Sequence, residues 1–198
     1  AKTTVAVNAS AATSVTGSAA DLIALYTASD ISGLGNEAIS VSETISVANA
    51  NTISGLTTGV VTSNLTSGNL ASFSALSGTG NAYTITVTDT SVSASALSAL
   101  AAKTTVAVNA SAATSVTGSV SELTTLYAAS DISGLGKEAI SVSSGAISVA
   151  QANTLNAATS GVITATISDG AISTLSGLTE AGNAYTITVT DTSVSASA

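Results

Sequence analysis

The sequence predicts a right-handed parallel solenoid, in which each coil of about 20–35 residues contributes one β-strand and one short helix or turn. Three observations lead to this prediction: a long internal repeat, short segments in which apolar and hydroxylated residues alternate, and helical spacing of the apolar residues between those segments. Two all-β sandwich domains are the alternative, although sandwich strands are joined by hairpins and Greek-key loops and the helical segments argue against them.

The internal repeat is visible in the letters of the sequence. The stretch NAYTITVTDTSVSASA, Asn81–Ala96, returns unchanged as Asn183–Ala198. We therefore expect two long repeats of about 101 residues: 1–101, with about four strand–helix coils, and 102–198, continuous with the first. The second copy stops where the first continues into LSALAAKTTVAV, so further copies are expected in the parent chain.

Strands are predicted where apolar and polar residues alternate. In 83–89, Tyr83, Ile85 and Val87 alternate with threonines, which gives one apolar and one hydroxylated face. The absence of proline agrees with this, because proline would remove a ladder hydrogen bond. The residues expected to face the core are Val5, Val7, Ile39, Val41, Ile85 and Val87. The predicted strands are 3–9, 38–43, 59–65, 83–89, 104–110, 139–143, 161–167 and 185–191.

Helical segments are predicted between the strands. The clearest, 20–29, places large apolar residues on one face. It opens with Ser18 and Asp21, and its copy opens with Ser119 and Glu122, which are the residue types of a helix capping box. Shorter helices of about two turns, which would be marginal alone, are expected at 47–53, 69–76 and 94–101.

Composition excludes several classes of function. The chain has 11 acidic residues against three lysines and a net charge of −8, so it lacks the basic surface that nucleic acid requires. Polar residues interrupt every apolar run, and no membrane insertion is expected. Without histidine, cysteine or arginine there is no ordinary base to activate the many hydroxyl groups, so an enzyme is not expected.

The motif DISGLG, at 30–35 and again at 131–136, is the most distinctive loop. Its glycines allow positive φ, and its aspartate can accept amide hydrogens across a tight turn. A corner turn is one interpretation and a calcium loop is the other, because calcium requires several converging oxygen ligands. No other cofactor is predicted. The candidate calcium ligands are Asp30, Glu37, Asp131 and Glu138.

Three further acidic residues lie at or near the ends of predicted strands. Asp89 and Asp191 follow the repeated strand and are expected to cap the segment that comes next. Glu43 occupies the matching place in VSETIS, but the second copy has no acid at that point. A continuous row of carboxylates is therefore not expected.

The phrases ISGLGNEAISVS, SVANANTISGLTTGVV and TGSAADLIALY resemble the repeats of giant secreted surface proteins of marine cyanobacteria and other Gram-negative bacteria. That family includes the very large swimming-associated surface protein of Synechococcus. The resemblance covers essentially the whole chain and implies an extracellular, acidic, tandemly repeated structural or adhesive module. The calcium-binding nonapeptide GGxGxDxUx of many relatives is missing, so calcium-driven folding is not implied.

The expected function is that of a structural repeat module in an extracellular surface protein or filament. It would act as a spacer and scaffold and would associate with itself, end to end with neighbouring repeats or chains, since neither end shows a polar capping coil. The alternative is an adhesive module that binds calcium or a glycan.

Overall fold

A computed structural model describes residues 5–195, and it shows a mixed α/β protein with parallel sheets. The chain forms two compact units. Of the described residues, unit 1 contains those up to Thr88 together with Ala99–Asn109, and unit 2 contains Asp89–Ser98 and those from Ala110 onward. None of the four sheets within residues 5–195 closes into a barrel.

Unit 1 is built on a four-stranded parallel sheet whose strands follow one another in chain order. Val15 lies opposite Ile39, Ile39 opposite Val61, and Ser63 opposite Tyr83, so the chain returns to the sheet every 20–24 residues. The strands are β2 (Ser14–Gly17), β4 (Ala38–Ile45), β5 (Val61–Leu65) and β6 (Ala82–Thr84). A separate parallel pair joins β1 (Val7–Asn8) to β3 (Ile31–Ser32), and β8 (Val108–Asn109) also belongs to this unit.

Unit 2 repeats the same plan with five parallel strands in chain order. Val92 lies opposite Val116, which is opposite Ile140, which in turn is opposite Ile163. The strands of this sheet are β7 (Ser91–Ser93), β9 (Ser115–Gly118), β11 (Ala139–Val142), β12 (Ile163–Thr166) and β13 (Ala184–Thr186), and the short β10 (Ile132–Ser133) completes the unit.

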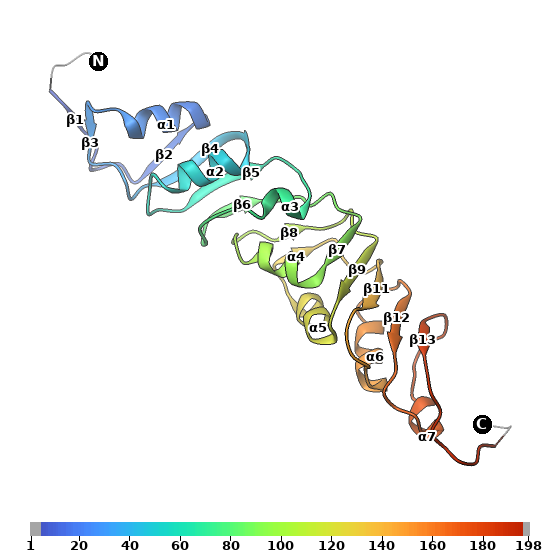
Figure 1. The fold of residues 1–198 in the computed structure, drawn as a ribbon. Coiled ribbons are helices and arrows are strands. Elements are labelled where there is room, and N and C mark those ends of the chain that lie inside the picture. The colour runs from blue at the N-terminus through green and yellow to red at the C-terminus, as the bar shows by residue number, and fades with distance from the viewer. Residues whose placement is uncertain (1–4, 196–198) are drawn as a thin grey trace. The chain divides into compact units, whose positions relative to one another are not determined.

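The predicted helical segments contain helices, although the one predicted over 69–76 is only four residues long, Leu70–Phe73. In unit 1, α1 and α2 contact each other as well as strands of the sheet, and so they line one face of it (Figure 1). Within residues 5–195, no helix is both long and apolar enough to cross a membrane. The helices are α1 (Ala19–Thr27), α2 (Val47–Ser54), α3 (Leu70–Phe73), α4 (Ala94–Ala101), α5 (Val120–Ala128), α6 (Val149–Asn156) and α7 (Ile172–Leu175).

The predicted serine caps are confirmed. Ser18 accepts a hydrogen bond from the Asp21 amide at the start of α1. Ser119 and Glu122 form a complete capping box at the start of α5, in which each side chain accepts from the other residue's amide. These contacts satisfy backbone donors that the first turn of a helix leaves unpaired.

The core consists of the apolar residues that alternate along the strands. In β5, buried and exposed residues alternate without interruption from Val61 to Leu65. Of the six residues predicted to face inward, Ile39, Ile85 and Val87 are buried and Val41 is half-buried. The prediction is wrong for Val5 and Val7, which are 72% and 51% exposed. Val108 has the same sequence neighbours as Val7 but is fully buried. The burial of this valine therefore depends on which segments pack against it and not on its local sequence.

The strand predictions need several corrections. The strand predicted over 83–89 is confined to Ala82–Thr84, with isolated bridges beyond it, and β7 was not predicted. Residues 3 and 4 of the first predicted strand lie outside the described residues, and the rest shortens to β1, which pairs only with β3. The place beside β4 is taken instead by β2, and in unit 2 the place beside β11 is taken by β9. Both strands have the sequence SVTG, whose single valine gives too short an alternation to be recognised.

Candidate functional site

The first DISGLG corner encloses a buried carboxylate. Glu37 is only 1% exposed and directly precedes β4. Its Oε1 accepts a hydrogen bond from the Gly35 amide at 3.0 Å, and its Oε2 accepts from the same amide at 2.9 Å and from the Tyr26 hydroxyl at 2.8 Å. Because Tyr26 belongs to α1, the carboxylate connects that helix to the corner loop.

The second corner reproduces this arrangement. Glu138 is buried, and both of its oxygens accept hydrogen bonds from the Gly136 amide, at 3.0 and 2.8 Å. The Lys137 amide and the Tyr127 hydroxyl also donate to it. Gly35 and Gly136 both have positive φ, as predicted from the motif, at 134° and 121°.

Opposing effects act on the carboxyl group of Glu37. Burial penalises the charged form and by itself would raise the pKa, but hydrogen bonds from the Gly35 amide and the Tyr26 hydroxyl favour that form. The net result is that the pKa of Glu37 lies below its ordinary value. The pKa of Tyr26 is raised, first by burial and then by its hydrogen bond to the Glu37 carboxylate. At neutral pH the pair therefore consists of an ionised carboxylate and a protonated phenol.

The structure separates the predicted calcium ligands by environment. Asp30 and Asp131 are exposed, whereas Glu37 and Glu138 are buried and already accept several hydrogen bonds. Among residues 5–195, no group of three or more acidic, histidine or cysteine side chains is arranged to hold a metal ion. Calcium binding at these four residues stays a prediction, and the contacts that the structure does show are those of a braced corner.

A threonine about 20 residues further along the chain closes each corner. Thr57 donates its hydroxyl to the Glu37 carbonyl at 2.6 Å and accepts from the Gly59 amide at 2.9 Å. Thr159 makes the same two contacts to the Glu138 carbonyl and the Gly161 amide, at 2.7 and 3.0 Å. Buried polar groups at the corners thus bond to a segment about 20 residues away in sequence.

Two acidic residues cap helices that precede them in the chain. Asp191 accepts a hydrogen bond from the Ile172 amide at 2.8 Å, at the start of the helix that precedes it. Glu43 accepts from the Ala19 amide at the start of α1 in the same way, at 3.0 Å. The segment that Asp191 is expected to cap extends into residues 196–198, outside the described residues, so that expectation stays a prediction.

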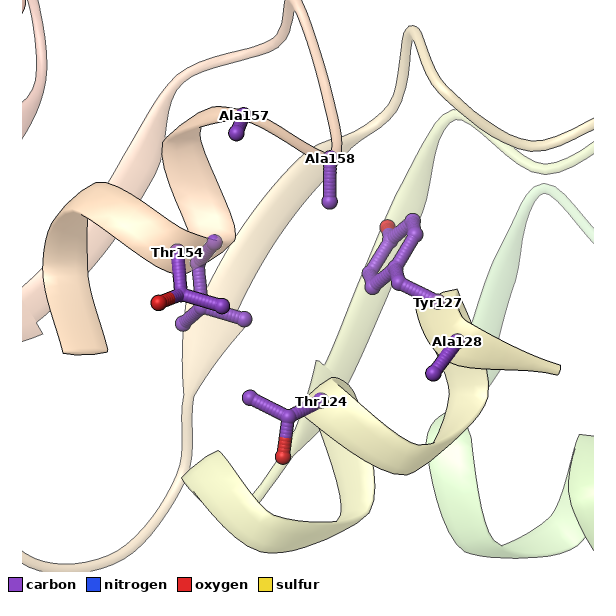
Figure 2. Close-up of a pocket in the computed structure, with 7 residues that line it drawn as sticks. Thr124, Tyr127, Ala128, Thr154, Ala157 and Ala158 are labelled. Atoms are coloured by element: carbon purple, nitrogen blue, oxygen red, sulfur yellow. The ribbon is translucent and has the colours of Figure 1, made fainter.

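Sequence reasoning missed a hollow between α5 and α6 in unit 2. It has a volume of about 280 Å³, and Figure 2 shows the Tyr127 ring facing it opposite Ala158 and Thr154. It is lined by Thr124, Tyr127, Ala128, Thr154, Leu155, Ala157 and Ala158. The lining is mainly apolar, and it includes the same tyrosine that donates to Glu138.

A comparison of the two copies could have revealed this hollow. Thr124 stands where the first copy has Ile23, and Ala158 stands where it has Leu56. Two large aliphatic side chains are therefore replaced by small ones, one on α5 and one in the turn that follows α6, which leaves space between them.

Comparisons of the chain with protein-family models, with curated proteins and with solved structures find no match. Function must therefore be inferred from the residues and their geometry.

Replacing Glu37 with glutamine is expected to lower stability near pH 7 and to have little effect in acid. A carboxyl whose pKa is lowered by folding stabilises the protein fully above its unfolded-state pKa, which is about 4.3, and loses that contribution as pH falls through the folded-state pKa. The measurement is the urea midpoint of the original chain and of Glu37→Gln between pH 2 and 7, and the two curves should converge only at the acidic end.

The same pair of proteins tests the calcium interpretation. If Glu37 is a ligand, millimolar calcium will raise the urea midpoint of the original chain at pH 7 and leave that of Glu37→Gln unchanged. In the pH experiment without calcium, parallel curves of urea midpoint against pH for the two proteins would contradict the role of the ionised carboxylate in bracing the corner.

Proposed function

We propose that this chain is a structural repeat module of an extracellular surface protein or filament. It serves as a spacer and scaffold, associates with itself, and has no enzymatic mechanism. The resemblance of its repeats to giant secreted surface proteins supports the location, and the acidic, cysteine-free composition agrees with it. On this proposal the two units form one right-handed solenoid, and the sequence repeats are its building blocks.

The observation that carries the proposal is that polar side chains in the interior form hydrogen bonds between segments distant in sequence. Asn81 accepts from the Val61 amide at 2.9 Å and donates to Ser54 at 3.0 Å, and Asn183 makes the corresponding contacts with Ile163 and Asn156. Together with Thr57, Glu37 and their copies, these side chains join coils 20–27 residues apart. Polar groups committed to coil stacking are those of a scaffold rather than of a reaction site.

The experiment is small-angle scattering on proteins with one, two and four tandem copies of the chain. The two sheets contain four and five strands, and at about 4.8 Å per parallel step each added copy should lengthen the particle by about 43 Å. A linear increase in maximum dimension at constant cross-section supports a rigid spacer. Growth with the square root of copy number, as for flexibly linked beads, would contradict it.

A further inference from the structure

The start of α6 in unit 2 shows how this fold satisfies two consecutive backbone amides. The Ser148 amide donates to Oε1 of Gln151 at 2.9 Å, and the Val149 amide donates to Oδ2 of Asp169 at 2.7 Å. Asp169 follows β12, so its carboxylate comes from a segment 20 residues further along the chain. A carboxylate is stabilised at this point because the first amides of a helix have no partner within the helix and carry partial positive charge.

The start of α2 in unit 1 corresponds to the start of α6 but lacks both of these acceptors. Asn49 stands in the place of the glutamine, with a side chain one methylene shorter, and Ser67 stands in the place of the aspartate. The hydroxyl of Ser46 still accepts from the Asn49 amide at 3.2 Å, so the helix begins in the same way. Within residues 5–195, however, neither the Ser46 amide nor the Val47 amide donates to a protein acceptor.

A hollow, which we call the α2 hollow, lies where the second copy holds the aspartate. It has a volume of about 350 Å³, and its lining includes Ser46 and Val47 themselves together with Ser67. The ring of Phe73, which is only 3% exposed, also lines it, and none of the described lining residues is charged. Two amides without a protein acceptor and an apolar wall therefore belong to the same hollow.

We propose that the α2 hollow binds a small carboxylate, which takes the place that the Asp169 side chain holds in unit 2. The carboxylate accepts from the Val47 amide, and the Ser46 amide and the Ser67 hydroxyl are the further donors. Consecutive amides of this kind form anion-binding concavities in other proteins. The short apolar body of the ligand packs against Phe73. This site is independent of the proposed scaffold function, so either can fail without the other.

The test is a titration of the isotope-labelled chain with sodium acetate and with sodium butyrate, followed by the NMR signals of the backbone amides. Ionic strength is held constant with sodium chloride near neutral pH, where both carboxylates are ionised. The signals of Ser46 and Val47 should shift and saturate, whereas that of Val149 should not, because its acceptor is already present. Butyrate should saturate the shift at a several-fold lower concentration than acetate, since its additional methylene groups leave water against Phe73. Equal affinities, or a shift at Val47 no larger than at Val149, would overturn the proposal.

Two substitutions exchange the residues of the two copies and serve as matched controls. Ser67→Asp supplies the carboxylate from the chain itself, so we expect a higher urea midpoint without ligand and loss of the acetate-dependent shift at Val47. Asp169→Ser should lower the midpoint and produce an acetate-dependent shift at Val149. General effects of acetate on stability act on all three proteins alike and cancel in the comparison. A Val47 signal that responds to acetate as strongly in Ser67→Asp as in the original chain would overturn the assignment of the ligand to this hollow.

Discussion

Replacing Ile85 with aspartate is expected to lower the free energy of unfolding by about 4 kcal/mol or more, whereas the same change at Ile187 should cost about 1 kcal/mol or less. The two isoleucines have identical sequence neighbours, YTITVTDTSVS. Ile85 is fully buried, so an aspartate there would be an unpaired charge in an apolar interior. At Ile187 the carboxylate reaches water. Urea unfolding followed by circular dichroism measures both values.

Both substitutions are measured in dilute solution, so that self-association does not affect the comparison. Equal destabilisation by the two substitutions would contradict the difference in burial between Ile85 and Ile187.

The helices could be predicted from sequence because their signals are local. Apolar residues at helical spacing with a serine cap were sufficient to place α1 and α5, and α4 begins and ends where it was expected. The ladder strands β2 and β9 were missed because each is held in place by pairing with β4 or β11 about 24 residues away. Such non-local pairing leaves little trace in a segment with one valine.

At the corner, the motif correctly indicated positive φ, but the role of the glutamate depended on a distant residue. Glu37 was considered as a ligand because its carboxylate follows a glycine loop, and the structure shows Tyr26, 11 residues earlier, donating to it. The recurrence of this pair as Tyr127 and Glu138 was visible in the sequence. It did not indicate a contact, because only the fold brings the helix over the loop.

Substituting Gly59 with alanine is expected to destabilise the chain by about 3 kcal/mol or more, the upper part of the range for overpacked sites. A Cβ at this position would lie 2.2 Å from the carbonyl oxygen of Glu37. That oxygen cannot move away, because it accepts the hydroxyl of Thr57 and belongs to the residue whose side chain braces the corner. The urea midpoint of Gly59→Ala measures the effect.

The second copy supplies both a replicate and a control. At Gly161 a Cβ would lie 2.3 Å from the Glu138 carbonyl oxygen, so Gly161→Ala should cost as much as Gly59→Ala. Gly55 provides the contrast, because its added Cβ would be 3.3 Å from its nearest neighbour and the second copy carries Ala157 in its place. Gly55→Ala should therefore be neutral or slightly stabilising, since alanine restricts the unfolded chain. If Gly59→Ala is as mild as Gly55→Ala, the backbone at Gly59 does not lie as close to the Glu37 carbonyl as the Thr57 hydrogen bond requires, and hydrogen bonding between these two segments loses its geometric basis.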